Sequence, residues 1–191
     1  MLAIAGAGGS LGPTVVRRLA RTGARLALAG RAAEPLEALA SDAGVDADVT
    51  AVDLLDQAAT RAWADGIAER TGQVDGLLHL VGGWRGGASI EESPPEDWDL
   101  LASLLIDTLQ NVTRAFTPHL LASGRGRFAI VSAAQAQAPT HTNAAYAAAK
   151  AAAEAWTLAL AHATLISATP LPSRQRSTWR STWICRGARS T

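Results

Sequence analysis

Near its start the chain reads Leu2-Ala-Ile-Ala-Gly-Ala-Gly-Gly-Ser-Leu-Gly12, and a helical pattern begins immediately afterwards at Pro13. A short apolar run therefore leads into a glycine-rich turn, and Pro13 suits the first turn of the helix that follows. Gly6, Gly9 and Gly12 are spaced by three residues. Glycines at such a turn let the backbone approach a pyrophosphate, whose charge the helix N-terminus favours. Many strand-to-helix turns are rich in glycine, so this stretch alone is weak evidence for a nucleotide site.

A second signal lies far along the chain, where its single tyrosine and single lysine occur together in Tyr146-Ala-Ala-Ala-Lys150. On a helix this spacing places both side chains on one face, about 6 Å apart along the axis. A neighbouring ammonium stabilises a phenolate, so Lys150 is expected to lower the pKa of Tyr146 from about 10 and make it a usable general acid or base. The alternative is an accidental pair on a solvated helix. The pair together with the glycine turn favours the catalytic interpretation.

The composition excludes several classes of protein. A chain of 191 residues is most simply one domain with a substantial core. No run of 18 apolar residues predicts a membrane span, and no signal peptide is expected, so a cytoplasmic protein is predicted. The single cysteine, Cys185, excludes a disulfide framework, and the four histidines show no metal-ligand spacing, so no metal site is expected.

Short apolar runs alternate with amphipathic segments along the first 165 residues, which predicts an α/β fold with a parallel sheet. Strands are predicted at 2–5, 25–29, 47–52, 76–81 and 127–132. Helices are predicted at 13–22, 34–41, 56–71, 96–122 and 143–163. Gly23, Gly44 and Gly72 stand where three of these helices should end, and Asn143 is a candidate N-cap for the last one.

The order of these features resembles the short-chain dehydrogenase/reductase family from residue 2 to about residue 163. Besides the two motifs above, Asp75-Gly-Leu-Leu-His-Leu-Val-Gly82 is similar to the end of the family's fourth strand, and Gly126-Arg-Phe-Ala-Ile-Val-Ser132 to its fifth. The resemblance implies a Rossmann-type doubly wound parallel sheet in one domain. It also implies an oxidoreductase that interconverts a carbonyl and an alcohol by hydride transfer with a nicotinamide nucleotide.

The resemblance also implies where that nucleotide binds. No acidic residue follows the second strand until Glu34, whereas Arg31 offers a donor fork for a 2′-phosphate, so NADP(H) is expected in preference to NAD(H). Arg31 could instead be an ordinary surface arginine. Asp53 matches the family's contact to the adenine amino group, although an aspartate at a strand end is also a common cap. The cofactor-binding residues implied are Gly6, Gly9, Ser10, Leu11, Gly12, Arg31, Asp53, Leu54, Gly82, Tyr146 and Lys150.

In the family the tyrosine transfers the proton, the lysine tunes it and holds the nicotinamide ribose, and a serine binds the substrate oxygen. Tyr146 and Lys150 match the first two roles. The serine position is Ala133, and Ser132, one residue earlier, should face away unless a bulge rotates it, so Ser132 is a provisional third catalytic residue. The family's relay asparagine is replaced by Leu105. A catalytically impaired nucleotide-binding relative is therefore the competing prediction.

Two further departures from the family concern the fourth strand and the segment that follows it. His79 and Leu80 replace paired asparagines that stabilise the family's central sheet, and Asn111 is too far along its helix to replace the relay asparagine. The glycine-rich segment 82–87 carries Trp84 and Arg85, which form either a lid over substrate or an ordinary surface turn.

Residues 164–191 differ in character from the rest. They contain no acidic residue, whereas five of the 17 basic residues, all arginines, fall there. An irregular basic tail is predicted, with the family's later strands missing. The favoured hypothesis is a truncated or frame-shifted reading frame, and a functional basic tail is the alternative. A GC-rich gene would account for the composition of this tail and for the scarcity of lysine in the rest of the chain. A nucleic-acid partner is not expected, because the body is acidic and lacks a recognition motif.

The expected partners follow from the resemblance. They are a small-molecule carbonyl or alcohol, with no membrane and no nucleic acid, and a second copy of the chain in a homodimer or homotetramer formed through helices 96–122 and 143–163. The substrate cannot be named, because specificity in the family resides mainly after the sixth strand.

Overall fold

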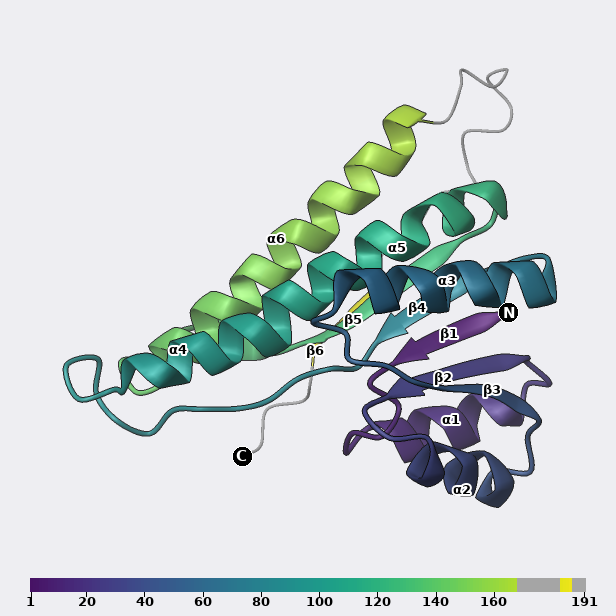
Figure 1. Cartoon of the computed structure of the whole chain (residues 1–191). Helices are drawn as coiled ribbons and strands as arrows, with labels where there is room; N and C mark the ends of the chain where they lie inside the picture. Colours follow the sequence, from purple (N-terminus) through teal and green to yellow (C-terminus); the bar gives the residue numbers. More distant parts are fainter. Residues whose placement is uncertain (168–182, 187–191) are drawn as a thin grey trace.

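The computed structural model describes residues 1–167 and 183–186, and its centre is one parallel β-sheet (Figure 1). The strand order is β3-β2-β1-β4-β5-β6. The chain passes from β3 at one edge back across the sheet to β4, which pairs with β1 and starts the second half of the fold. The strands are β1 Leu2–Ala5, β2 Leu26–Gly30, β3 Ala47–Ala51, β4 Gly76–His79, β5 Arg127–Ser132 and β6 Trp183–Arg186. All neighbouring pairs are parallel, as the alternation of strands and helices predicts.

Helices cover both faces of the sheet (Figure 1), which confirms the doubly wound Rossmann-type fold. One face carries α1 Gly12–Ala20 and α2 Glu34–Asp42, and the other α3 Gln57–Thr71, α5 Thr108–Ala122 and α6 Ala144–Ser167. Before α5, helix α4 Pro95–Ala102 continues through a π-helical stretch, η1 Ser103–Asp107. The sequence predicted one helix over 96–122, so the π-helical stretch is the difference.

Alternating strand residues build the two cores. Ile4, Leu26 and Leu28 pack toward α1 and α2, where Leu36 also lies. The intervening positions, such as Ala3 and Ala27, are small and pack against the α3–α5 layer, in which Trp63 and Phe116 meet edge to face with ring centroids 4.7 Å apart. Small strand residues leave room for these large rings, so the helices lie close to the sheet.

The predicted helix ends are confirmed. Gly23, Gly44 and Gly72 all have φ between 64° and 75°, a left-handed backbone that favours glycine. Asn143 directly precedes α6, but its side chain accepts a hydrogen bond from the Thr140 N–H rather than from a helix N–H. The predicted side-chain cap is therefore replaced by a turn that positions the helix start.

The prediction that no strand follows residue 163 is wrong for Trp183–Arg186. The structure places β6 beside β5, with Ile130 opposite Ile184 and Ser132 opposite Arg186. Tryptophan and isoleucine favour strands, and the outer edge of β5 supplies unpaired backbone groups. Helix α6 also runs to Ser167, four residues beyond its predicted end. The rest of the predicted irregular tail, 168–182 and 187–191, lies outside the described residues.

In the part of the chain that the structure covers, none of the helices has the length and apolar character needed to cross a membrane.

Asp75 ties three segments together at the amino edge of the sheet. Its carboxylate accepts from the Met1 ammonium at 2.9 Å, from Arg125 at 2.8 Å and from Gln73 at 2.7 Å. The hydrogen bond from Arg125 is the largest cause that holds the pKa of Asp75 below its ordinary value of 3.8, and the Met1 ammonium adds to it against the opposing effect of burial.

Asp75→Asn should therefore lower the free energy of unfolding, and the loss should depend on pH. Because the folded pKa is depressed, the carboxylate stabilises the fold fully above the unfolded value near 3.8, and this contribution disappears as the pH falls through the folded value. Urea unfolding of both proteins from pH 7 to pH 3 measures the difference, with Asp46→Asn as an exposed control. A difference that stayed constant over this range would contradict the assignment.

Candidate active site

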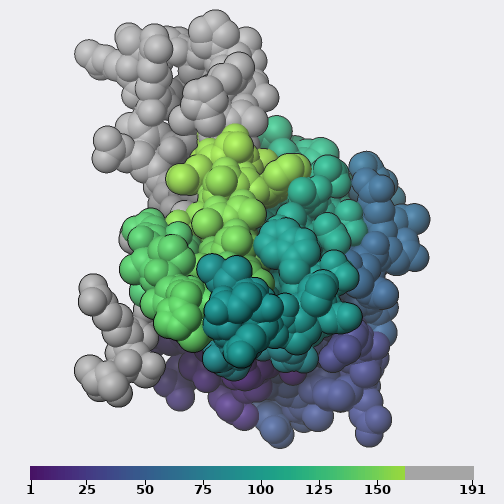
Figure 2. All heavy atoms as spheres, turned by 90° about the vertical axis from the view of Figure 1, so that its left-hand side faces the viewer, coloured from purple at the N-terminus to yellow at the C-terminus, as the bar shows by residue number. Residues whose placement is uncertain are grey.

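Parallel strands bring all the predicted site residues to one edge of the sheet, because every strand ends there. The glycine turn follows β1, Arg31 follows β2, Asp53 follows β3, Gly82 follows β4 and Ala133 follows β5. Figure 2 faces this edge, with α4 in teal near the centre, the green segment that precedes α6 beside it and the purple N-terminal region below. The candidate active site is therefore the carboxyl edge of the sheet, the usual ligand edge of a doubly wound fold.

The glycine turn is shaped by two close approaches of the backbone. A Cβ at Gly12 would overlap the carbonyl group of Ala7, and one at Gly6 would lie 2.8 Å from Val81, at a position whose φ is +80°. Hydrogen bonds from the Gly9 N–H to the Gly6 oxygen and from the Gly12 N–H to the Gly9 oxygen, both 3.0 Å, close the turn. Residues 8–11 between these points are exposed. An exposed glycine-rich backbone at the N-terminus of α1 fits a bound pyrophosphate.

The structure also places the predicted nucleoside contacts. Arg31 is exposed directly after the last residue of β2, and Asp53 is exposed with its Oδ1 accepting from the Leu55 N–H at 2.9 Å. The Leu54 side chain is buried in the core, so only its backbone can contact a ligand. Asn111 Nδ2 donates to the Leu54 oxygen at 3.0 Å and anchors this loop to α5.

Tyr146 and Lys150 lie on the first turns of α6 and face the same side. The Tyr146 ring is half-buried against Leu101, Leu105 and Ala149. The Lys150 side chain is buried and its Nζ donates to the Val131 carbonyl oxygen at 2.8 Å. Lys150 Nζ lies 5.8 Å from the centroid of the Tyr146 ring. The predicted pair on one helix face is thus brought to the same edge as the glycine turn.

The pKa of Tyr146 does not shift as the sequence predicted. Burial raises the pKa of Tyr146 above its ordinary value, and burial lowers the pKa of Lys150 against the opposing charge of Glu154. The prediction that Lys150 lowers the pKa of Tyr146 is wrong for this arrangement, because the ammonium is directed to Val131 while the ring is desolvated by apolar neighbours. The phenol is accordingly protonated at neutral pH.

Ser132 occupies a different environment from the one its provisional role requires. The side chain is buried, and its hydroxyl donates to Glu154 Oε1 at 2.6 Å, while Gln137 Nε2 donates to Oε2 at 3.3 Å. Strand β5 pairs in regular register through Ser132, so no bulge rotates it. The structure therefore corrects the prediction that Ser132 binds the substrate oxygen: its hydroxyl joins β5 to α6.

We expect Ser132→Ala to act on stability rather than on catalysis. Removing the hydroxyl takes one hydrogen-bond donor away from the buried Glu154 carboxylate, which costs about 1–3 kcal/mol. Urea unfolding and steady-state kinetics measure the two effects separately, and kcat should change less than about threefold because such a residue acts outside the reacting atoms. A large fall in kcat with unchanged stability would restore the catalytic role.

Of the three positions where the family pattern has asparagine, Leu105 and His79 are buried. Leu105 is buried in η1 against Tyr146, as its apolar character requires. His79, at the end of β4, is also buried, and its Nε2 lies 3.2 Å from Thr108 Oγ1. Burial, and then the charge of Lys150, lowers the pKa of His79 to about 3. The sequence did not predict the contact between His79 and Thr108, because the spacing of the two residues follows no recognisable motif.

The glycine-rich segment after β4 is anchored at two points. Arg85 Nε lies 3.7 Å from Asp97 Oδ1 on α4, and the Gly87 N–H donates to the Thr142 oxygen at 2.7 Å, just before α6. Trp84 is 57% exposed. The segment is thus held beside the start of the Tyr146 helix, and its lid or surface-turn role stays a prediction.

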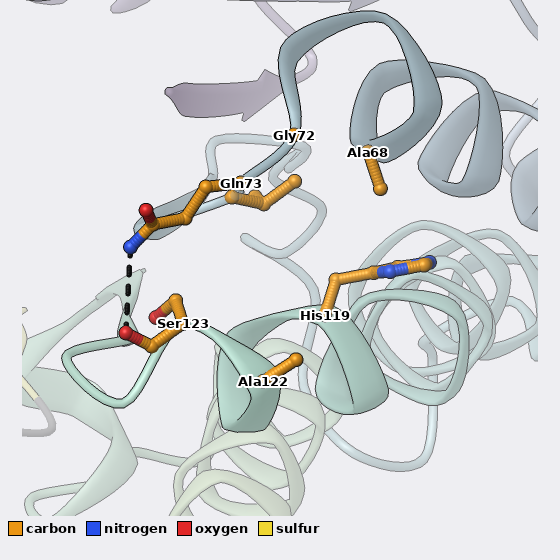
Figure 3. Close-up of a pocket in the computed structure, with 7 residues that line it drawn as sticks. Ala68, Gly72, Gln73, His119, Ala122 and Ser123 are labelled. Atoms are coloured by element: carbon orange, nitrogen blue, oxygen red, sulfur yellow. Dashed lines mark hydrogen bonds between the residues drawn. The ribbon is translucent and has the colours of Figure 1, made fainter.

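A shallow pocket of about 170 Å³ lies elsewhere, at the amino edge of the sheet between the C-terminal ends of α3 and α5 (Figure 3). It is lined by Ala68, Gly72, His119 and Ala122, and the Gln73 side chain crosses to the Ser123 oxygen at 3.3 Å. His119 pairs with Asp65 at 2.7 Å. None of the predicted site residues reaches this pocket. Within residues 1–161 no group of three metal-ligating side chains converges.

Comparison with known proteins agrees with this arrangement. A family model described as short chain dehydrogenase matches residues 1–166. The chain belongs to the short-chain dehydrogenase family. Its fold and the order of its motifs are therefore those that the resemblance implied.

Individual relatives in the family are moderately similar. Gluconate 5-dehydrogenase of Gluconobacter oxydans (strain 621H) is 31% identical over 137 residues, which are 70% of this chain and 53% of that protein. Among solved structures, gluconate 5-dehydrogenase from Burkholderia cenocepacia J2315 in complex with NADP and tartrate has a TM-score of 0.77 at 31% identity, covering 85% of this chain and 64% of that one.

A metagenomic short-chain oxidoreductase in complex with NADP has a TM-score of 0.76 at 28% identity, covering 85% of this chain and 75% of that one. The chain spans about half the length of the first curated short-chain dehydrogenases that it matches.

Proposed function

We propose that the chain is an NADP(H)-dependent oxidoreductase that interconverts a small carbonyl compound and its alcohol. The observation that carries the proposal is that the Tyr146–Lys150 pair and an exposed glycine-rich turn lie at the same edge of the sheet. Similarity to dehydrogenases that were solved with NADP supports it.

Different residues of the chain are proposed to bind different parts of the nucleotide. The turn from Gly6 to Gly12, with Ser10 and Leu11 between them, holds the pyrophosphate through backbone N–H groups and the N-terminus of α1. Asp53 and the Leu54 backbone contact the adenine end, Arg31 binds a 2′-phosphate, and Gly82 leaves space beside the turn. The nicotinamide nucleotide, when bound, supplies or accepts the hydride.

Tyr146 holds the proton that the substrate oxygen gains or loses. A protonated phenol at neutral pH is suited to donate to a carbonyl oxygen, so carbonyl reduction is the direction that its raised pKa favours. The Lys150 ammonium is directed to the Val131 oxygen, so its proposed role is to bind the nucleotide ribose and not to lower the pKa of Tyr146. Because the Val131 oxygen uses one of its three hydrogens, Lys150 keeps two donors for the nucleotide ribose and its surroundings.

Nucleotide preference tests the assignment of Arg31. NADPH should bind more tightly than NADH in a fluorescence titration, and Arg31→Ala should weaken NADPH about 10- to 100-fold while leaving NADH unchanged, because a charged hydrogen bond contributes about 1.5–3 kcal/mol. Arg61→Ala, on the exposed side of α3, is the matched control. Equal loss for both nucleotides, or no loss, would contradict a 2′-phosphate contact.

A catalytically impaired relative is the second candidate, and two observations favour it. The Ser132 hydroxyl donates its hydrogen bond to Glu154, and the position of the family's relay asparagine holds the buried apolar side chain of Leu105. If a missing donor limits turnover, Ala133→Ser should raise kcat about 100-fold, the usual value of one stabilising donor in the transition state. Tight NADPH binding with no turnover in either protein would establish the impaired reading.

The proposed partners follow the same family pattern. We infer a homodimer or homotetramer through the surface of α4, η1, α5 and α6, where Trp98, Leu100 and Leu158 are exposed. Neither a nucleic acid nor a membrane is proposed as a partner, and the cytoplasmic location stays a prediction.

A further inference from the structure

His79 holds a defined position in the interior. It is the last residue of β4, it lies opposite Ile130 of β5, and its side chain is 4% exposed. Its Nε2 is 3.2 Å from Thr108 Oγ1 at the start of α5. The imidazole therefore points into the layer where α5 and α6 cover the sheet.

The hydrogen bonds of Thr108 fix the tautomer of this imidazole. A threonine hydroxyl carries one hydrogen, and Thr108 donates it to the Leu104 carbonyl oxygen at 2.7 Å. The contact to His79 must then run the other way, so Nε2 carries the proton and donates to Oγ1. Burial keeps the ring neutral, which leaves Nδ1 as an acceptor. Nδ1 is buried and has no hydrogen-bond donor among the described residues.

A buried ammonium lies at the same end of the same strands. Lys150 Nζ donates to the oxygen of Val131, the residue after Ile130, which is in register with His79. The charge of Lys150 acts on His79, so the two groups are electrostatically coupled. Two hydrogens of the ammonium are not used by Val131. On α6, Tyr146 lies one turn before Lys150 and Glu154 one turn after it, and the charge of Glu154 acts on Lys150.

We propose that His79 Nδ1 and the Lys150 ammonium share one buried water molecule, which donates to Nδ1 and accepts from Nζ. A buried water needs two to four polar partners, and here an acceptor and a donor supply two of them. His79 is then a positioning residue: with the Val131 oxygen it fixes two directions of the amine and leaves the third hydrogen for a nucleotide. The catalytic meaning of this arrangement rests on the proposed function, but the hydrogen bond itself does not.

Nitrogen NMR of the histidine ring tests the hydrogen bond without any nucleotide. In the full chain labelled with ¹⁵N-histidine, His79→Asn assigns the signal. The wild type should show the Nε2–H tautomer from pH 5 to pH 9, with an Nδ1 shift typical of a hydrogen-bonded acceptor. Lys150→Met should move that shift toward the value of an acceptor without a donor. An Nδ1–H tautomer, a charged ring, or an Nδ1 shift indifferent to Lys150→Met would overturn the proposal.

Two conservative variants separate the ring nitrogens functionally. The side-chain oxygen of asparagine can occupy the place of Nδ1, whereas the longer glutamine presents its amide near Nε2. His79→Asn should therefore keep the dissociation constant of NADPH within about threefold of wild type, and His79→Gln should raise it about tenfold, the value of one lost hydrogen bond. The reverse order would overturn the positioning role.

The proposed function can fail separately. If wild type binds no nucleotide, that proposal falls, while the NMR comparison still decides whether His79 and Lys150 share a hydrogen-bonded water.

Discussion

Gly12→Ala is expected to abolish nucleotide binding and to lower the free energy of unfolding by about 3 kcal/mol, at the upper end of overpacking effects. An added Cβ would occupy the place of the Ala7 carbonyl group, and the Ala7 backbone cannot yield without opening the turn between β1 and α1. Urea unfolding and NADPH fluorescence titration measure the two losses in the same preparation.

Gly8→Ala is the matched control for this experiment. Gly8 belongs to the same turn, but a Cβ there would meet only Leu36 Cδ2, at an ordinary contact distance of 3.7 Å. Its stability should stay within about 0.5 kcal/mol of wild type, as for a surface substitution. Equal destabilisation by both substitutions would mean that the close approach at Gly12 is not the cause.

Tyr146→Phe is expected to reduce kcat about 10²- to 10⁴-fold, the usual contribution of a positioned general acid or base. The phenylalanine ring can keep the apolar contacts with Leu101 and Leu105, so thermal stability should hardly change. Steady-state rates on a panel of ketones and aldehydes, with NADPH titration alongside, separate lost chemistry from lost binding.

Lys150→Met is the variant to compare with Tyr146→Phe. It removes the ammonium from beside Val131 and should weaken NADPH binding as well as kcat, whereas Tyr146→Phe should leave the dissociation constant nearly unchanged. Activity that survives Tyr146→Phe would remove Tyr146 from the reaction and overturn the proposed role of the pair.

Most of the fold was predictable because its signals are local. Apolar runs, helical periodicity and the stop signals at Gly23, Gly44 and Gly72 placed the first five strands within about two residues of their observed ends. The π-helical stretch and strand β6 were not predictable in this way. No local pattern in the sequence marks the π-helical stretch, and β6 depends on the open edge of the neighbouring strand β5.

The candidate site divides along the same line. The glycine turn and the Tyr146–Lys150 pair are contiguous patterns, and the parallel sheet brings them to one edge. The hydrogen-bond partners of Ser132 and Lys150 lie 22 and 19 residues away in the sequence. No local pattern therefore predicted that Glu154 and the Val131 oxygen would be these partners. The burial of His79 beside Thr108 depends likewise on tertiary packing.

The most direct measurement is a crystal structure of the chain with NADP⁺ bound. The pyrophosphate should lie over the backbone of residues 8–12, the 2′-phosphate beside Arg31, and the nicotinamide ring next to the Tyr146 hydroxyl and the Lys150 amine. A nucleotide bound at another edge of the sheet, or a nicotinamide ring remote from both side chains, would contradict the proposed active site.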